Sequence, residues 1–196
     1  MMVQARKNFM TKLLLIGIGL FAMSSLCFAA PPSGPVARFE APLLITTAGQ
    51  SIDYETVKVL ANRLKIQNVT DNAAKPEDLS GKKTLIVVPA HSNKGLGSAG
   101  TNIADEMQRV KVLLAAAVKG KIPVVLYHLG GEVRRSADSD PFIEQVMTVA
   151  KCVVVWAPGN NDGYFTKKCA QKNIPLVVVD KLSDLTGIMK SMFLGN

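Results

Sequence analysis

Six short apolar runs alternate with amphipathic stretches along this chain, and this alternation constrains its fold more than any other feature. Runs such as Leu43–Thr47 and Thr84–Val88 are continuous and rich in β-branched residues, a pattern typical of strands buried on both faces of a parallel sheet. The stretches between runs repeat apolar residues every three or four positions, as Ile103–Lys119 does, which favours helices packed on one side. The alternation therefore predicts right-handed βαβ units.

We expect an α/β fold: a three-layer sandwich with a doubly wound, mainly parallel sheet of five or six strands, flavodoxin-like or Rossmann-like. The preferred strand order is 2-1-3-4-5 with the sixth strand at the edge, and the alternative is 3-2-1-4-5-6. The strands are expected at Leu43–Thr47, Ile66–Thr70, Thr84–Val88, Val124–His128, Cys152–Trp156 and Leu176–Val179.

The first 29 residues have the pattern of a secretory signal peptide. Basic residues precede an apolar run, and Cys27 and Ala29 are the small residues that a cut after Ala29 requires. A lipoprotein cut before Cys27 and an uncleaved membrane anchor are the alternatives. We expect residues 30–41 to be a proline-rich tether and residues 42–196 a single α/β domain. The protein is then exported, periplasmic or extracellular, and not stably inserted in a membrane.

The charge of the chain disfavours nucleic acid as a partner. Removing three basic residues with the leader lowers the formal net charge from +8 to +5, and the remaining basic residues are scattered without interleaved aromatic residues. Such a mild excess fits a small anionic ligand, and it fits plain solubility equally well.

Polar loops follow the first, third, fourth and fifth expected strands, and in this architecture such loops converge on the rim at the carboxyl ends of the strands. The opposite rim carries ordinary turn residues. We therefore expect the ligand-binding residues among Gly49, Gln50, Ser51, Ser92, Asn93, Lys94, Gly130, Gly131, Glu132, Arg134, Arg135, Asn160 and Asn161.

The segment Thr46–Ser51 resembles the phosphate loop of flavodoxins, Thr-x-Thr-Gly-x-Thr, with Ala48 and Ser51 in place of two threonines. The resemblance implies that backbone N–H groups and hydroxyls at a helix start hold a phosphate or carboxylate. Alternatively, Ser51 simply caps the helix. No cofactor is expected; FMN is a minor alternative, because the loop from His91 to Thr101 lacks the aromatic residues that flank a flavin.

Gly95–Gly100 matches the pattern G-x-G-x-x-G, but the dinucleotide fingerprint needs its first glycine at the strand end and an acidic residue after the next strand, and both are missing here. We interpret this segment as a mobile loop with Lys94 over an anion, or as a merely flexible loop. Similarly, Arg134 and Arg135 suggest a guanidinium clamp for a carboxylate or phosphate, or a solvated loop.

His91 and His128 both fall at the ends of neighbouring strands. Together with Asp162 they are the candidates for general acid or base chemistry, although no adjacent nucleophile is evident. Two scattered histidines do not make a metal-ligand motif, so no metal is expected. Cys152 and Cys169 are either a disulfide pair or two buried thiols.

The chain resembles a family of exported bacterial α/β domains of unknown function. The residues that carry this resemblance are Leu43–Ser51, Ser92–Gly100, Gly130–Arg135 and Gly159–Thr166. The resemblance implies that the loops of the same rim are functional, but no activity is known for the family. Two hypotheses remain: a domain that binds a small anionic ligand at this rim, or a periplasmic hydrolase or transferase that uses His91 or His128 as general acid or base.

Overall fold

The computed structural model describes residues 37–195. The expected signal peptide and most of the expected tether lie outside these residues. Within the part that is described, no helix is long and apolar enough to cross a membrane.

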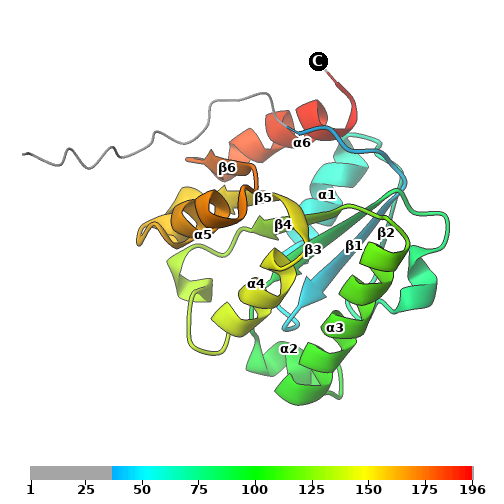
Figure 1. Cartoon of the computed structure of the whole chain (residues 1–196), viewed down its shortest axis with the longest axis vertical. Helices are drawn as coiled ribbons and strands as arrows, with labels where there is room; N and C mark the ends of the chain where they lie inside the picture. Colours follow the sequence, from blue (N-terminus) through cyan, green and yellow to red (C-terminus); the bar gives the residue numbers. More distant parts are fainter. Residues whose placement is uncertain (1–36, 196) are drawn as a thin grey trace, which may run out of the picture.

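One six-stranded, all-parallel sheet forms the centre of the molecule (Figure 1). Its order is β2-β1-β3-β4-β5-β6, which confirms the preferred order and shows that 3-2-1-4-5-6 is wrong. Every residue of β1, β3 and β4 is buried, as the continuous apolar runs predicted. The strands are β1 Leu43–Ala48, β2 Asn68–Thr70, β3 Thr84–Pro89, β4 Val124–His128, β5 Ala150–Trp156 and β6 Leu176–Val179.

Helices cover both faces of the sheet and complete three layers. On one face, Val57 of α1 and Met189 of α6 pack against the sheet, whereas Val110 of α3, Phe142 of α4 and Phe165 of α5 pack on the other. Figure 1 shows α3 and α4 in front of the strands and α1 behind them. The helices are α1 Tyr54–Arg63, α2 Asn93–Ser98, α3 Ile103–Lys119, α4 Asp140–Met147, α5 Tyr164–Lys172 and α6 Leu185–Phe193, and the 3-10 turns are η1 Pro76–Leu79, η2 Glu132–Arg134, η3 Ala157–Asn160 and η4 Leu182–Asp184.

Helix α4 ends at Met147, and Val149, just beyond it, still packs against the core cluster on this face. At the start of the helix, the Asp140 carboxylate accepts two hydrogen bonds from the guanidinium of Arg135. No side chain among the described residues caps this helix start, and an ion pair to the β4 loop holds it instead.

The two cysteines are buried free thiols. Cys152 belongs to the apolar cluster on the α1 and α6 face, while Cys169 belongs to the cluster on the opposite face. The sheet separates them, and burial raises the pKa of the Cys152 thiol to about 11 and that of Cys169 to about 12. The structure thus agrees with the alternative of two buried thiols rather than a disulfide.

The last residues of the expected tether are docked on the domain. Phe39 donates a backbone hydrogen bond to the carbonyl of Met192 (2.8 Å), and its ring lies 6.2 Å from that of Phe193. The side chain of Thr84 donates a hydrogen bond to the carbonyl of Glu40. This segment therefore ties the start of β3 to the end of α6.

Candidate ligand-binding site

The loops after β1 and β3 are joined to each other at the carboxyl rim. Ser51 N–H donates to the carbonyl of Ala90 and Ser92 N–H donates to that of Gly49, which pairs Gln50 with His91 in an antiparallel bridge. Gly49 has φ +94°, and a Cβ there would lie 2.6 Å from the Ala90 oxygen. Only glycine fits this approach without strain. The bridge places both loops at the point where strand order reverses, between β1 and β3.

The phosphate-like segment Thr46–Ser51 already holds an anion, the carboxylate of Glu106 from α3. Gly49 N–H donates to Glu106 Oε1 (3.0 Å), and Gln50 Nε2 donates to Oε2 (3.1 Å). Arg109 adds two bonds of 2.7 and 2.8 Å and also binds the carbonyl of Thr47. Because Glu106 is only 1% exposed, these groups are not open to an external ligand. The segment that resembles the flavodoxin phosphate loop therefore contacts an internal carboxylate.

Gln50 is also tied to the loop after β2. Its Nε2 donates to the carbonyl of Asn72 (2.8 Å), and Asn72 Nδ2 donates back to Gln50 Oε1 (3.2 Å). The Gln50 amide is thereby fully engaged. Its hydrogen bonds connect the β1 loop to the β2 loop and to Glu106 of α3 at this part of the rim.

The glycine-rich segment after β3 forms helix α2, so the expected mobile loop was wrong. Ser92 Oγ accepts a hydrogen bond from Gly95 N–H (3.1 Å), a cap of the kind that starts helices. A Cβ at Gly95 would lie 2.0 Å from the Gln50 oxygen. The glycine thus serves close packing of α2 on the β1 loop, and the helix presents Asn93 and Lys94 at the surface.

A cavity of about 410 Å³ opens where these elements meet, at the β1/β3 switch point. We call it the switch-point cavity. Its lining comes from the β1 loop, the start of α1, the β2 loop, α2 and the β4 loop. The lining residues are Gln50, Ile52, Tyr54, Asn72, Ser92, Lys94, Gly95, Ser98, Ala99 and Arg134.

Several side chains of the switch-point cavity are free to donate hydrogen bonds. The side chains of Lys94 and Ser98 make no hydrogen bond or ion pair with any of residues 37–195. Ser92 Oγ accepts from Gly95, so its own proton is available to donate. The Gln50 Oε1 acceptor, by contrast, is already bound by Asn72 Nδ2. The cavity is therefore matched to a ligand that presents acceptors.

Arg134 closes the cavity from the β4 loop, a segment of residues 130–139 that we call the strap. Its Nε lies 3.4 Å from Asp53 Oδ2, and its Nη1 donates a long 3.4 Å hydrogen bond to the carbonyl of His91. The side chain remains 30% exposed. Gly130 allows this packing, because a Cβ there would lie 2.0 Å from Arg134 Cγ. Arg134 is thus positioned at the cavity by long contacts that a ligand could replace.

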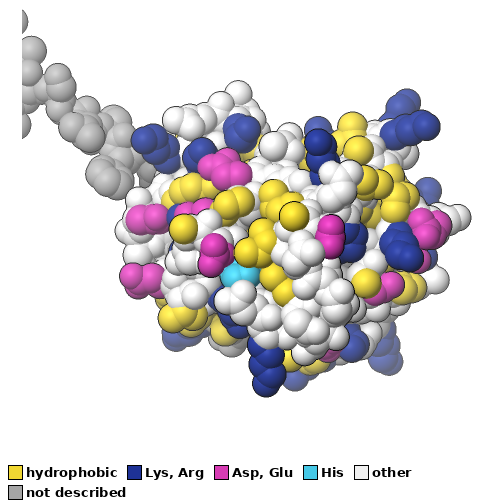
Figure 2. All heavy atoms as spheres, turned by 90° about the horizontal axis from the view of Figure 1, so that it is seen from below, with side chains coloured by type: hydrophobic (Ala, Val, Ile, Leu, Met, Phe, Trp, Pro, Cys, Tyr) yellow, Lys and Arg dark blue, Asp and Glu magenta, His cyan; other side chains and the backbone are white. Residues whose placement is uncertain are grey.

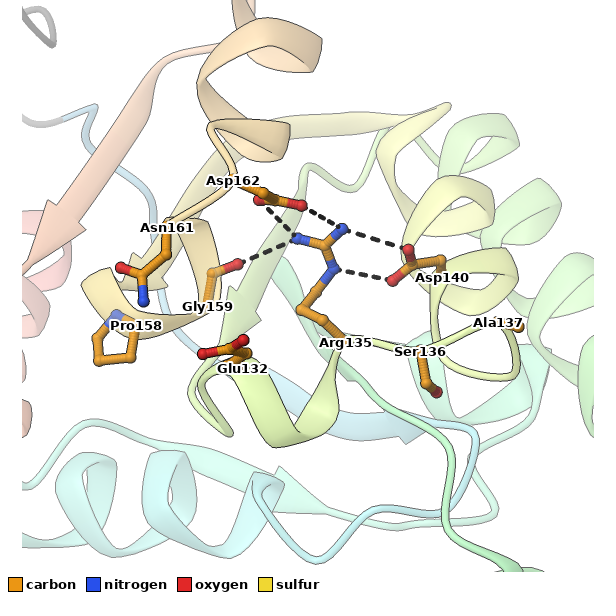
Figure 3. A pocket seen from close by; sticks show the side chains of 9 residues that line it. All are labelled: Glu132, Arg135, Ser136, Ala137, Asp140, Pro158, Gly159, Asn161 and Asp162. Atoms are coloured by element: carbon orange, nitrogen blue, oxygen red, sulfur yellow. Dashed lines mark hydrogen bonds and ion pairs between the residues drawn. The ribbon is translucent and has the colours of Figure 1, made fainter.

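A second cavity, of about 320 Å³, lies on the other side of the strap (Figure 3). We call it the β4–β5 cavity. Arg135 is 11% exposed at its wall, and it binds the carboxylates of Asp140 and Asp162 and the carbonyl of Gly159. Its guanidinium also lies 4.0 Å from the centre of the Tyr164 ring. In Figure 3 Asp140, Asp162 and Gly159 surround the guanidinium, while the Glu132 carboxylate makes no marked contact with it. Arg135 is a structural link between loops.

The other residues expected in the later loops have local structural roles as well. Asn160 Oδ1 accepts hydrogen bonds from Phe165 and Thr166 N–H at the start of α5. Gly131 has φ +63°, and a Cβ there would lie 3.0 Å from the Trp156 ring. Asn161 lines the β4–β5 cavity. Burial on its own would raise the pKa of Asp162, but hydrogen bonds from the Tyr164 N–H and the Arg135 guanidinium to its carboxylate hold that pKa below its ordinary value.

The two histidines occupy different environments. His128 is 1% exposed, with Nε2 3.2 Å from the Gly131 oxygen and Nδ1 3.4 Å from that of Pro89. Burial lowers its pKa, so the ring is neutral at pH 7 and its single N–H donates to only one of these two carbonyls. His91 has a 7% exposed side chain, its Nδ1 is 3.7 Å from Asp138 Oδ2, and its buried Nε2 has no partner among the described residues.

Within residues 37–195, no group of three or more His, Cys, Asp or Glu side chains is arranged to hold a metal ion. Seen from below in Figure 2, hydrophobic, basic and acidic side chains are interspersed, with a small area of histidine between them. The face carries no broad surface of a single charge. Recognition on it has to come from local groups in a cavity.

A family model described as Domain of unknown function (DUF6305) matches residues 40–193. The chain belongs to this family. The match covers nearly all of the described α/β domain and agrees with the resemblance to a family of unknown function. No curated protein sequence gives a significant match.

Among solved structures, this DUF6305 domain is similar to AlinE4, an SGNH-hydrolase family esterase, at 12% identity and a TM-score of 0.30, covering 72% of this chain and 75% of that chain. It is also similar to a GDP-L-fucose synthetase from Naegleria fowleri bound to NADP, at 6% identity and a TM-score of 0.34, covering 75% and 51%. At such TM-scores neither likeness carries an argument about activity.

Eight of the sixteen expected site residues of the DUF6305 domain line the two cavities. The switch-point cavity holds Gln50, Ser92, Lys94 and Arg134, and the β4–β5 cavity holds Glu132, Arg135, Asn161 and Asp162. The other eight line neither cavity: Gly49, Ser51, His91, Asn93, His128, Gly130, Gly131 and Asn160. Sequence reasoning missed Ile52, Tyr54, Asn72, Ser98 and Ala99. Of these, only Ile52 gave a usable signal, as an apolar residue between a polar turn and a helix. The others line the cavity because α1, α2 and the β2 loop happen to converge there.

Proposed function

We propose that this domain binds a small anionic molecule in the switch-point cavity. The observation that carries the proposal is the group of free donors in the lining. Among residues 37–195 the Lys94 ammonium group has no partner, and Ser92 and Ser98 offer hydroxyl protons. A phosphate or carboxylate supplies only acceptors at neutral pH, so it complements these groups.

The location of the cavity supports the same function. Open α/β sheets bind ligands outside the carboxyl ends of their strands at the switch point, which is where this cavity lies. Its volume of about 410 Å³ is within the range of small-molecule sites. Tyr54, the first residue of α1, lines it, and the positive end of a helix dipole favours an anion.

The carboxylate of Asp53 limits how much negative charge a ligand of this site can carry. It pairs with Arg134, so the cavity combines one free cation and one cation that is already partly neutralised. An entering anion would share Arg134 with Asp53. We therefore expect a ligand with one anionic group and micromolar to millimolar affinity rather than a polyanion, because each additional negative charge would meet Asp53.

The test is to titrate the protein with inorganic phosphate and, separately, with acetate. Binding is measured by isothermal titration calorimetry and by the rise in the midpoint of thermal unfolding. Lys94→Ala and Arg134→Ala should each weaken binding about tenfold, the value of one charge-assisted hydrogen bond. Lys151→Ala and Arg63→Ala, exposed cations outside the cavity, are the matched controls and should bind as the wild type does. Binding that neither cavity variant weakens would contradict the proposal.

A second candidate function, acid or base catalysis by a hydrolase or transferase, is favoured by one observation. His91 faces a carboxylate through Nδ1 and has a buried, unpartnered Nε2, which is the arrangement of an oriented general base. Its test is turnover of p-nitrophenyl acetate. His91→Gln should abolish turnover while leaving anion binding unchanged. Equal turnover by the wild type and the His91→Gln variant would rule this function out.

We propose export as the setting of the protein, on the strength of the leader-like residues 1–29. The mature form would begin at Ala30. The intact mass of protein recovered from the periplasm or medium tests this directly. A mass that corresponds to the full 196 residues would contradict cleavage.

A further inference from the structure

The switch-point cavity has an apolar side in addition to its donor side, and this side indicates what kind of anion it takes. Ile52 is 70% exposed, although isoleucine is among the residues most often buried. It stands immediately before α1 and lines the cavity together with Tyr54, while Ala99 lines it from the end of α2. Single exposed apolar residues are ordinary, but this one belongs to a concave surface that faces free cations.

We infer that the ligand is an amphipathic monoanion: a carboxylate or phosphate group attached to a short aliphatic or aromatic body. This inference rests on the proposed anion site. The anionic group lies between Lys94 and Arg134, and the apolar body covers Ile52 and Tyr54. A bare inorganic anion would leave that apolar side exposed to water.

Tyr54 fits the role of an apolar wall. Burial, and then the carboxylate of Glu55, raises the pKa of its phenol above the ordinary value, so the ring carries no charge at neutral pH. Its ring is also partly buried against the core cluster on the α1 face. It therefore presents a fixed and neutral surface to the ligand, at the same helix start that favours the anionic group.

The Gln50 amide places no demand on the ligand body. Its nitrogen donates to the Asn72 carbonyl and to Glu106 and its oxygen accepts from Asn72 Nδ2, so an apolar body that lies over Gln50 leaves this amide paired. A body with several hydroxyl groups would instead find few free acceptors. This argues against a sugar phosphate and for an apolar body.

The experiment measures the affinity of the mature protein for straight-chain monocarboxylates from acetate to octanoate, with inorganic phosphate as an anion that has no apolar part. Affinity should rise about fourfold per methylene, the gain from burying one CH₂, until the apolar side is covered. Ile52→Ser should lower octanoate affinity about fivefold and leave acetate affinity unchanged. Val59→Ser, a similarly exposed apolar residue of α1 outside the cavity, is the matched control.

The outcomes separate this inference from the proposed function. If acetate and octanoate bind equally and Lys94→Ala weakens both, the anion site stands and the amphipathic ligand is wrong. If the affinity rises with chain length but Ile52→Ser and Val59→Ser behave alike, the apolar body lies elsewhere and the inference is also wrong. If no anion binds, both the proposed function and the inference fail.

Discussion

The two cavities of the rim share the strap as a common wall, but they differ in what their arginines are free to do. Arg135 is almost buried and holds two carboxylates and a carbonyl, whereas Arg134, one residue earlier, makes only long contacts and remains partly exposed. The β4–β5 cavity thus uses its charge to fasten loops, and the switch-point cavity keeps its charge available. Two adjacent arginines therefore need not have the same role, because the partners around each decide it.

The largest expected effect concerns the internal anion beneath the switch-point cavity. Glu106→Ala should destabilise the fold by about 3 to 5 kcal/mol, since it leaves the charge of Arg109 and the Gly49 N–H without a partner in a buried position. The measurement is urea unfolding. Asp105→Ala, which removes an exposed carboxylate from the same turn of α3, is the control and should cost about 1 kcal/mol or less.

Formate or acetate added to Glu106→Ala sharpens this test. A small carboxylate should bind in the space left by the side chain and raise the urea midpoint of the variant but not that of Asp105→Ala. A variant that unfolds like the wild type would show that the loop needs no internal anion.

The next effect compares the two arginines directly. Arg135→Ala should destabilise the protein by about 2 kcal/mol, because Asp140 and the Gly159 carbonyl lose charge-assisted bonds in a mostly buried place. Arg134→Ala should change stability by less than about 1 kcal/mol and should instead weaken anion binding. Thermal unfolding and calorimetry of both variants measure the contrast. The reverse pattern, or equal effects on stability, would break the distinction between the cavities.

A smaller effect depends on pH. Burial lowers the pKa of His128 below its ordinary value of 6.5, so the unfolded chain takes up this proton first as the pH falls. The stability is therefore complete well above pH 6.5 and is lost progressively below it, by about 1.4 kcal/mol for each unit of pKa shift. Urea unfolding between about pH 7.5 and 5.5 measures the slope. His128→Gln should remove it, and an unchanged slope would assign the effect to another group.

The smallest effect is expected at Lys94. Because its side chain makes no ion pair or hydrogen bond among residues 37–195, Lys94→Ala should leave the free energy of unfolding within about 0.5 kcal/mol of the wild type. It should nevertheless weaken anion binding. A marked loss of stability would show that Lys94 is structural, and the switch-point cavity would then resemble the β4–β5 cavity.

Local pattern was enough to predict the strands, but not the helix α2 or the contacts between elements. The strands were predicted within a few residues, because burial on both faces of a parallel sheet leaves a continuous β-branched run. The glycine-rich segment was interpreted as a loop, yet Ser92 caps a helix there and Gly95 packs on Gln50. The glycine-rich composition indicated a flexible loop, whereas Gly95 is needed because the backbone of α2 packs closely against Gln50.

What the sequence by itself determined is the α/β class and the rim that carries polar loops, since periodicity and handedness depend on neighbouring residues. It left two strand orders open, and the tertiary structure chose between them. Only the tertiary structure decided which polar groups are free. Glu106 lies 57 positions from Gly49, and no local pattern reveals that its carboxylate occupies the phosphate-like loop. Likewise, Arg134 and Arg135 look alike in sequence, and their partners come from Asp53, Asp140 and Asp162 on separate elements. The availability of a charged group depends on which distant groups already satisfy it, and that is a property of the assembled rim.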